Sequence, residues 1–530
     1  MPPIQIGAVD FAILGVYLVF IVWLGLRVSK KHETAEEYFL AGRKLTWPFI
    51  GLSLFASNIS TGSLVGMAGA AYGTGLAVYN YEWFAVVILI VFAIFFLPYY
   101  LRSKVYTLPE FLERRFDGRA RYYHAVVSIT GNLLIDTAGS LYAGALAIVL
   151  ILPGVELWQA VAGLAIITGI YTVMGGLTAV VYTDSIQAVL LLIGSIVITV
   201  VAFGQVGSWD AMIAAVSDDH LHLIRPADDS YMPWPGLLLG VPLLGFYYWT
   251  TNQYIVQRAL GAASVRHGQW GALFAGLLKV PVLFIMVVPG LLGLALYPGL
   301  ESANQIFPTL MYTLLPTGLL GLVLAGFVAA LMSSVDSALN SASTLATMDF
   351  YHRVRPHSSS EHLMVVGRVF TILFVVVAAL AAPQIDRFPN LFDYLQLVLA
   401  YISPPIVAAF LLGMFWRRTT PSGAFAGLVA GGIVGLVLFV AKTFLYAEAL
   451  EPLHFLYVAF ILFSVAAIVM LLVSLITTPP LPEKVEHYSW SRGVFDAESV
   501  ELRALPWYKN YRIQSIALLA VTLAVVVYFW

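Results

Sequence analysis

The sequence predicts an all-α membrane protein, and three observations carry that prediction. Of the 530 residues, 60% are hydrophobic and only 11% are charged, against roughly 25% charged residues in soluble domains. The apolar residues gather in runs long enough to cross a hydrocarbon layer about 30 Å thick. Inside lipid, every backbone amide and carbonyl must be paired within its own segment, so these runs must be helices.

The apolar runs predict fourteen membrane-spanning helices. Their expected bounds are 6–28, 46–72, 79–100, 122–152, 158–175, 180–204, 235–257, 269–297, 317–347, 364–383, 390–416, 421–444, 453–476 and 513–530. Only a short segment that begins Gly175-Gly176-Leu177 separates the expected helices 158–175 and 180–204. These two helices could therefore be mistaken for one long apolar run. The connections 205–234 and 477–512 have no expected fold of their own, and the second, which begins Thr-Thr-Pro-Pro-Leu-Pro, is expected to be a mobile connector. The whole chain, 1–530, is thus expected to form a single transmembrane domain.

The distribution of lysine and arginine orients these helices. Basic residues concentrate in short cytoplasmic loops of membrane proteins. With fourteen helices and both termini outside, 22 of the 27 basic residues fall on the cytoplasmic side. We therefore expect a multi-pass protein of the plasma (inner) membrane with both termini on the outer, periplasmic face. No basic stripe suggests nucleic acid as a partner.

Among the charged residues inside the expected helices, where a charge at mid-bilayer costs at least about 2.5–3.5 kcal/mol, seven are candidates for a functional role. They are Glu82, Asp136, Asp184, Lys279, Asp336, Arg368 and Asp393. Structural roles are favoured for two: Arg368 near a helix end would extend to the cytoplasmic surface, and Asp393 at a helix start would cap free amides. A solvated or paired role along a polar path is favoured for the deeper groups Asp136, Asp184, Lys279 and Asp336.

Two polar stretches interrupt otherwise apolar helices. Residues 57–63 read Ser-Asn-Ile-Ser-Thr-Gly-Ser, which predicts an unwound segment whose free carbonyls line a cavity. On the ninth helix, a spacing of 3.6 residues aligns Ser333, Ser337, Asn340 and Thr344, with Ser334 beside them. Small polar residues also join packed helices, so the second stretch alone favours helix packing. The run 79–83, Tyr-Asn-Tyr-Glu-Trp, fits an interfacial aromatic belt or a hydrogen-bonding wall for a hydroxylated solute.

Several segments resemble the sodium/solute symporter family, in particular its sodium/glucose cotransporter branch and the bacterial sodium/galactose-type symporters. They are 35–43, 53–59, 175–184, 340–344, 391–396 and 413–435, in the family's order along nearly the whole chain. The resemblance implies a LeuT-type core, an inverted repeat of five plus five helices within the fourteen. The first repeat would be 46–204 and the second 235–416, with peripheral helices at 6–28, 421–476 and 513–530.

The resemblance also implies that Na⁺ is the coupling ion. Its site would consist of three backbone carbonyls and two hydroxyls, from Ala56, Ile59, Ala330, Ser333 and Ser334. Asp184 matches a family carboxylate on the route of the ion to the cytoplasm. Asp336, beside Ser337, replaces a hydroxylated or small residue of the sugar-transporting relatives. A carboxylate there would support a second cation or proton site.

For the solute, the resemblance implies a sugar or polyol such as a hexose or an inositol. The expected polar groups of the site are Ser63, Glu82, Lys279 and Gln396. The expected inner aromatic gate is formed by Tyr248 and Trp249, and the expected outer apolar lid by Met67, Tyr142 and Phe392. Tyr81 and Asn58 of the two polar runs complete it. Three positions depart from sugar-transporting relatives: Ser63 replaces Gln or His, Ala85 a Ser, and Gly245 an Asn. These differences argue against galactose.

Three other classes of function were weighed against this one. A channel would share the spans, but a broken helix beside a buried Glu, Lys and Gln favours an occluded site. An enzyme is not expected, because the ten histidines fall in loops or near helix ends and no HExxH or GxSxG motif occurs. The serious alternative is a Na⁺-coupled symporter of a non-sugar solute, such as an organic acid or amino acid, whose carboxylate would pair with Lys279.

Overall fold

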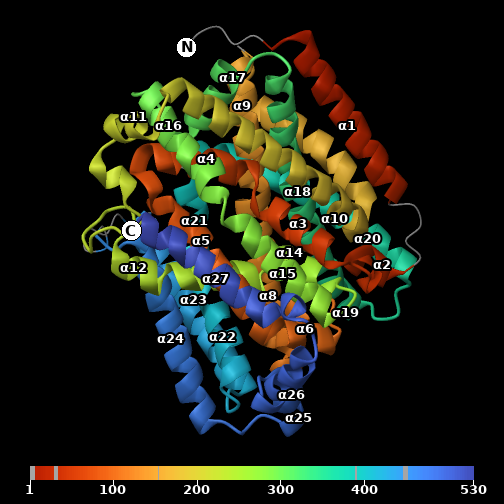
Figure 1. Ribbon diagram of the computed structural model, residues 1–530. Coiled ribbons are helices and arrows are strands. Elements are labelled where there is room, and N and C mark those ends of the chain that lie inside the picture. Colours follow the sequence, from red (N-terminus) through yellow and green to blue (C-terminus); the bar gives the residue numbers. More distant parts are fainter. Residues whose placement is uncertain are drawn as a thin grey trace.

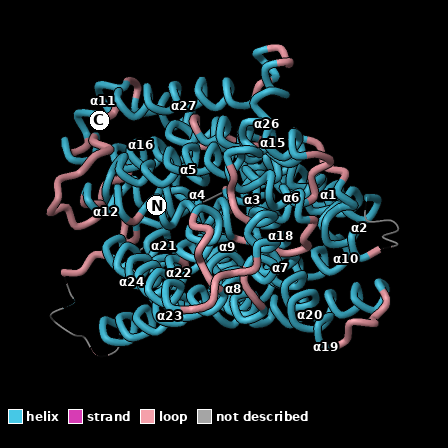
Figure 2. The backbone as a smooth tube through the Cα atoms, turned by 90° about the horizontal axis from the view of Figure 1, so that it is seen from below, coloured by secondary structure: helices cyan, strands magenta, loops and turns pink. Residues whose placement is uncertain are grey.

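The computed structural model describes residues 6–28, 34–152, 154–387, 391–443, 445, 450 and 452–530. These residues form helices and loops throughout (Figures 1 and 2). Eight helical segments among them are long and apolar enough to cross a membrane, or ten if each of two bent pairs counts as one span. The expected all-helical membrane architecture is therefore confirmed, while the count of fourteen spans stays a prediction.

The helices are given in chain order. They are α1 (Ala8–Val28), α2 (Ala35–Leu40), α3 (Trp47–Asn58), α4 (Thr61–Thr74), α5 (Asn80–Val91), α6 (Leu97–Ser103), α7 (Leu108–Arg115), α8 (Gly118–Gly131), α9 (Ala138–Ile151), α10 (Leu157–Val206), α11 (Trp209–Ala215), α12 (Trp234–Leu239), α13 (Val241–Phe246) and α14 (Gln253–Leu260). They continue with α15 (Val265–Lys279), α16 (Val288–Leu296), α17 (Ile306–Leu314), α18 (Leu319–Leu345), α19 (His352–Val354), α20 (Ser360–Ala381), α21 (Leu391–Ile402), α22 (Pro404–Phe415), α23 (Pro421–Thr443), α24 (Phe455–Ile476), α25 (Pro482–Tyr488), α26 (Arg492–Arg503) and α27 (Tyr511–Tyr528).

The break expected in the second span is confirmed. Helix α3 ends at Asn58, Ile59 leaves the helical region with φ −87° and ψ 79°, and α4 begins at Thr61. Ser60 caps α4, since its hydroxyl accepts a hydrogen bond from the Ser63 amide at 2.9 Å. The run of small polar residues thus ends one helix and starts the next, because serine and asparagine side chains compete for backbone groups.

A second break, which the sequence reasoning did not predict, interrupts the seventh expected span. After α13 the chain passes through a π-helical segment, Tyr247–Thr251, and Asn252 leaves the helical region with φ −76° and ψ 121°. The Asn252 side chain then caps α14 by accepting from the Tyr254 amide at 3.0 Å. A similar π-helical segment, Asn132–Thr137, joins α8 to α9. Such segments are rare and concentrate at functional sites.

Helix α10 covers both the fifth and the sixth expected spans. A straight helix would separate residues 164 and 190 by about 39 Å at 1.5 Å per residue. However, Leu164 packs beside Leu331 of α18, and a Cβ on Gly326 of the same helix would lie 3.1 Å from the Leu190 carbonyl oxygen. Residues 164 and 190 of α10 therefore contact positions of α18 that are only five residues apart, 331 and 326. The chain must reverse its direction between residues 164 and 190. The separation was expected at Gly175 and Gly176, whose surroundings lie outside the described part of the structure.

Burial separates central from peripheral helices. In its most apolar window α18 is 83% buried, whereas the windows of α20, α23, α24 and α27 are each 28% buried. Close approach in the centre depends on small residues: a Cβ on Gly290 of α16 would lie 2.3 Å from the Ala68 carbonyl oxygen of α4. In Figure 1 the mostly exposed helices α1 and α24 lie at opposite edges of the bundle.

The two long connections contain more structure than expected. The segment 477–512 forms α25 and α26, which lie together at the lower end of the molecule in Figure 1. It is fixed by hydrogen bonds from Trp490 N to the Met414 carbonyl at 2.9 Å and from Gln269 to Glu498 at 2.9 Å. Within 205–234, α11 and a 3₁₀ turn form. The helices of this segment were not predicted from sequence, because polar contacts rather than apolar periodicity hold them.

Candidate functional site

A cavity of about 90 Å³ lies beside the break between α3 and α4. Its walls come from both broken helices, from the two π-helical segments Asn132–Thr137 and Tyr247–Thr251, and from α5, α18 and α21. Its polar and aromatic lining residues are Ser57, Asn58, Ser60, Ser63, Tyr81, Glu82, Asp136, Ser140, Tyr248, Trp249, Tyr254, Ser334, Phe392 and Gln396. Such a mixture of hydrogen-bonding and ring-bearing groups suits a small hydroxylated molecule.

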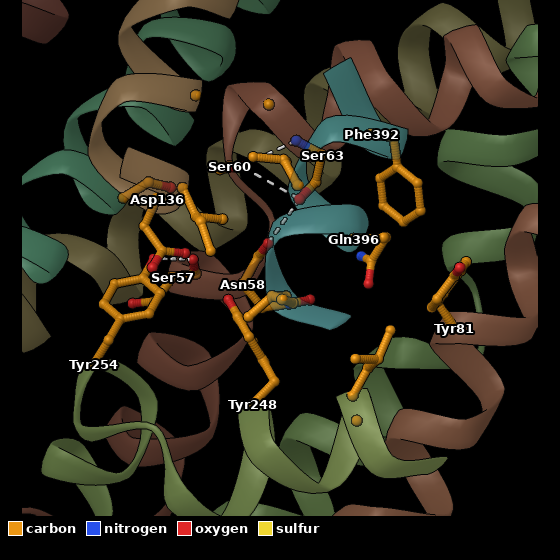
Figure 3. Close-up of a pocket in the computed structure, with 18 of the residues that line it drawn as sticks. Ser57, Asn58, Ser60, Ser63, Tyr81, Asp136, Tyr248, Tyr254, Phe392 and Gln396 are labelled. Carbon is orange, nitrogen blue, oxygen red and sulfur yellow. Dashed lines mark hydrogen bonds between the residues drawn. The ribbon is translucent and has the colours of Figure 1, made fainter. Parts of the chain in front are cut away.

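Figure 3 shows how these groups divide the cavity. Asp136 and Tyr254 lie on one side, and Tyr81, Phe392 and Gln396 lie on the other. The hydroxyl of Ser63 donates to the Asn58 carbonyl at 2.9 Å, so it is partly used by the helix break itself. Gln396 therefore offers a freer amide to a solute than Ser63 offers a hydroxyl.

A buried ion pair fixes the polar wall. The Lys279 ammonium donates to Glu82 Oε2 at 2.5 Å and also to the Asn58 side-chain oxygen. The Lys279 side chain is 0% exposed and that of Glu82 is 9% exposed. Lys279 thus joins α15 to α5 and to the end of α3. Breaking such a buried pair by removing one partner costs about 3–5 kcal/mol.

Aromatic rings form the remaining walls. Tyr248 and Trp249 contact each other edge to face with their centroids 5.3 Å apart. Tyr81 and Phe392 make a similar contact with their centroids 5.2 Å apart. The apolar faces of a sugar or cyclitol ring could pack against these surfaces while its hydroxyls reach the polar wall. The run 79–83 is accordingly not a lipid-facing belt, since Tyr79 and Asn80 are both 0% exposed.

Of the expected solute residues, three do not line the cavity. Lys279 stands behind Glu82, as described above. Met67 is buried in α4, and Tyr142 donates to Asp386 at 2.8 Å. Among the three positions that depart from sugar-transporting relatives, Ser63 and Gly245 face the cavity, whereas Ala85 does not.

The expected sodium ligands lie where the break meets α18. Around the break, the Phe55 carbonyl accepts the Ile59 amide, and the Asn58 carbonyl accepts the Ser60 amide. Within the described residues, no hydrogen bond outside regular helix ends on the carbonyls of Ala56 or Ile59. On α18 the Ser334 hydroxyl donates to the Ala330 carbonyl at 2.9 Å, and Ser333 is fully buried. Ser334 also lines the cavity, so these positions adjoin the candidate solute site.

A buried polar cluster lies one turn before the break. Asp184 Oδ2 accepts from Ser53 at 2.6 Å, from Ser57 at 3.2 Å and from Ser337 at 3.4 Å. Arg258 completes the cluster with its Nη2 3.6 Å from the same oxygen, and both side chains are at most 1% exposed. The sequence reasoning had placed Arg258 in a cytoplasmic loop, because it lies beyond the last apolar residues of its span.

Asp336 borders this cluster. Its Oδ1 lies 3.3 Å from the Ser337 hydroxyl, which also contacts Ser57 of α3 at 3.3 Å. The Asp336 side chain is 0% exposed, and its Oδ2 has no hydrogen-bond partner among the described residues. Oxygen atoms from three helices, α3, α10 and α18, thus meet here, and oxygen ligands suit a hard cation better than a soft one.

Several cavity residues were not assigned to the site in advance, and three of them are Asp136, Ser57 and Tyr254. Asp136 had been noted as an intramembrane charge without a role, and Ser57 and Tyr254 had no solute role. Asp136 reaches the cavity from the π-helical segment Asn132–Thr137, and Tyr254 follows the unexpected break at Asn252. Irregular backbone of this kind leaves little trace in apolar periodicity.

Comparison with known proteins agrees with this geometry. Residues 38–431 match the model of the sodium:solute symporter family. The chain is 38% identical to the sodium/myo-inositol cotransporter 2 of Oryctolagus cuniculus, over 91% of this chain and 78% of that protein. It is 37% identical to the sodium/glucose cotransporter 4 of Danio rerio, over 95% of this chain and 84% of that protein.

Solved structures show the same fold. A Na⁺-coupled sialic acid symporter in a substrate-bound outward-open state superposes with a TM-score of 0.78 at 24% identity, over 90% of this chain and 99% of that one. Mhp1, a nucleobase-cation-symport-1 family transporter, superposes with a TM-score of 0.57 at 13% identity, over 86% of this chain and 99% of that one. With a family match over most of its length and relatives well above 30% identity, this chain belongs to the sodium:solute symporter family.

Proposed function

We propose that the protein couples the inward movement of Na⁺ to the uptake of a sugar or polyol, such as a hexose or an inositol. The observation that carries the proposal is the cavity beside the break. Glu82, Asn58 and Gln396 offer hydrogen bonds there, while Tyr248 and Trp249 offer ring surfaces. The named relatives, which are sodium/myo-inositol and sodium/glucose cotransporters, support the same class of solute.

The state of Lys279 separates this proposal from an organic acid or amino acid carrier. A carboxylate solute would need a free cation in the site. Lys279 is instead fully buried behind Glu82, and its charge is already matched at 2.5 Å. A solute carboxylate would have to displace Glu82 and leave it buried without a partner, which is costly. A neutral hydroxylated solute can use Glu82 as an acceptor without disturbing the pair.

We propose that the coupling ion binds the carbonyls of Ala56, Ile59 and Ala330 and the hydroxyls of Ser333 and Ser334. Free carbonyls at a helix break are typical Na⁺ ligands in transporters. An ion held there would join the end of α3 and the break to α18 and stabilise the wall of the solute cavity. Release to the cytoplasm would follow rotation of one repeat against the other.

Two broken helices support an inverted repeat over 46–204 and 235–416. One break lies at Ile59 and the other at Asn252, each in the first helix of its expected repeat. Transporters built this way place their sites at such breaks. We retain fourteen spans with both termini outside the plasma membrane as part of the proposal.

Asp184, Asp336 and Ser337 are proposed as an ion route and a second cation or proton site. Their oxygens converge next to the proposed sodium site, with Ser57 and Ser337 in contact between α3 and α18. Arg258 already neutralises one of the two carboxylates. Asp336 is therefore the residue on which an additional bound cation would depend.

The energy available is sufficient for concentrative uptake. One Na⁺ crossing 100 mV releases about 2.3 kcal/mol, and a tenfold sodium gradient adds about 1.4 kcal/mol. Together, about 3.7 kcal/mol would sustain a solute gradient of several hundredfold for a single ion.

Uptake into proteoliposomes with an imposed Na⁺ gradient tests the proposal. Labelled hexose and myo-inositol would be offered in turn, with sialic acid and amino acids as competitors. We expect a hexose or inositol to enter only with Na⁺ outside and to be competed only by neutral hydroxylated solutes. If only an anion or an amino acid is transported, the sugar or polyol assignment is wrong.

A further inference from the structure

A groove opens on the surface of the bundle between α15 and α27. The two helices lie next to each other (Figures 1 and 2), and a Cβ on Gly276 of α15 would lie 3.1 Å from the Leu518 side chain of α27. The groove has a volume of about 710 Å³, within the size range of sites for small molecules and cofactors. Its lining residues differ from those of the solute cavity, so it is a separate feature of the molecule.

Most of the groove is apolar. Its walls are formed by Leu273, Phe274 and Leu277 of α15 and by Ala517, Leu518 and Val521 of α27. Leu277 is 52% exposed and Val521 is 50% exposed, so both side chains face lipid tails in a membrane. From residue 266 to residue 277, α15 rises about 16 Å at 1.5 Å per residue. This length matches half of a hydrocarbon layer about 30 Å thick, so one acyl chain of a single leaflet fits along the groove.

One end of the groove is aromatic and basic. Both α15 and α27 begin at this end, and the groove is lined there by Trp47, Trp270, Tyr508 and Lys509. Trp270 also lines an adjoining pocket, which contains Arg102 and Arg266. Tryptophan and tyrosine at the ends of membrane helices are typical of the interface between lipid tails and headgroups. The three basic residues therefore lie at the level of a lipid phosphate.

The charges at this end do not cancel. Two carboxylates line the adjoining pocket, Glu498 and Glu501. Glu498 is already paired with Arg512 at 2.7 Å. Within the part of the chain that the structure describes, no ion pair joins a carboxylate to Arg102, Arg266 or Lys509. Three cations thus face one carboxylate, and the excess of positive charge suits an anionic headgroup.

We propose that this groove binds an anionic phospholipid. The phosphate lies against the three basic residues, and one acyl chain lies along α15 and α27. All three basic residues belong to loops expected on the cytoplasmic side, where anionic lipids attract basic segments. Helix α15 ends at Lys279, whose ammonium donates to Glu82 beside the solute cavity. A lipid held against α15 therefore stabilises the helix that positions this pair. The choice of leaflet rests on the proposed orientation, whereas the binding itself does not.

Thermal unfolding of the purified full chain in detergent tests the proposal. Phosphatidylglycerol and phosphatidylcholine with the same acyl chains would be titrated separately, and inorganic phosphate would be added in a third series. We expect the unfolding temperature to rise saturably with phosphatidylglycerol, because a ligand that binds only the folded protein stabilises it. Phosphatidylcholine, which lacks net charge, and inorganic phosphate, which lacks an acyl chain, should give a much smaller rise at the same concentrations.

Two pairs of variants separate the headgroup from the acyl chain. A basic residue near an anionic lipid surface contributes about fivefold to binding. Arg266→Gln combined with Lys509→Gln should therefore raise the phosphatidylglycerol concentration for half-maximal stabilisation about thirtyfold. The matched control, Arg355→Gln combined with Arg417→Gln, removes two exposed cations outside the groove and should leave this concentration unchanged.

The second pair fills the apolar part of the groove. Val521→Trp places a large side chain where the acyl chain lies, so it should also weaken the effect of phosphatidylglycerol. Its control is Val527→Trp, at a position of α27 that is 68% exposed and lies outside the groove. The control should respond to phosphatidylglycerol as the wild type does.

Three results would overturn the proposal. The first is an equal rise of the unfolding temperature with phosphatidylcholine or with inorganic phosphate. The second is an equal loss of the phosphatidylglycerol effect in the two double variants. The third is a Val521→Trp variant that keeps the lipid effect but dissociates a dimer, which would assign the groove to a second copy of the chain. Unfolding is measured without solute or a Na⁺ gradient, so these results are independent of the proposed uptake function.

Discussion

The buried pair between Lys279 and Glu82 gives the most quantitative prediction. Replacing Lys279 by Met removes the ammonium but leaves the Glu82 carboxylate with 9% of its side chain exposed. At the observed 2.5 Å, the attraction lost is about 6–7 kcal/mol for an effective dielectric constant near 20. Removing one partner of a buried pair has a measured net cost of about 3–5 kcal/mol, because the pair itself also carried a desolvation penalty.

This cost should appear in both stability and transport. Lys279→Met also removes the bond to Asn58 at the end of α3, so the wall of the solute cavity loses its tether. We expect the apparent melting temperature in detergent to fall by several degrees and Na⁺-driven uptake to fall by about two orders of magnitude or more, as 3–5 kcal/mol implies.

A double variant separates charge from solute recognition. Lys279→Met combined with Glu82→Gln removes both charges, so most of the lost thermal stability should return. Uptake should stay low, because the carboxylate of Glu82 at the cavity wall and the ammonium of Lys279 behind it are gone. If Lys279→Met alone has wild-type stability and uptake, Lys279 does not neutralise a buried Glu82 and this description of the site is wrong.

Three further predictions concern the ion path. Ser334→Ala should raise the Na⁺ concentration for half-maximal uptake by about tenfold or more, since a bond to a charged group contributes about 1.5–3 kcal/mol. The control Ser343→Ala removes a hydroxyl that donates to the Asn340 carbonyl at 3.0 Å, and it should leave this concentration unchanged. Equal effects of the two substitutions would count against the proposed sodium site. Arg258→Met should reduce expression and uptake by leaving Asp184 buried without its partner, and adding Asp184→Asn should restore expression; failure of that rescue would contradict the pairing. Asp336→Ser should lower the steepness of the dependence of uptake on Na⁺ concentration, and an unchanged slope would exclude a second Na⁺ that needs this carboxylate.

The parts of the fold that depend on composition could be predicted from sequence. The break near Ile59 was anticipated because six of the seven residues in 57–63 are small or polar, a poor lipid-facing helix. The break at Asn252 was missed because its flanks, Tyr-Tyr-Trp-Thr-Thr and Gln-Tyr-Ile-Val, still read as a continuous apolar span. In the sequence, only Asn252, whose side chain can cap a helix, indicates that the span is interrupted there.

Residues brought together by tertiary contacts were harder to predict. Arg258 looks like a loop residue in sequence, yet it is buried beside Asp184 through a contact across 74 positions. The segment 477–512 lacks apolar periodicity, and its helices are held by contacts such as Ser489 to the Gly413 carbonyl at 2.9 Å. Asp136 was visible as an intramembrane charge, but the π-helical segment that directs it to the cavity was not.

Concentrative accumulation tests the central claim most directly. Purified protein in sealed vesicles would receive labelled myo-inositol or glucose at equal concentration on both sides, with an inward Na⁺ gradient. The account predicts that the internal solute rises above the external level and returns to it when an ionophore dissipates the Na⁺ gradient. It would be contradicted if internal and external concentrations stay equal for both solutes while the gradient is maintained.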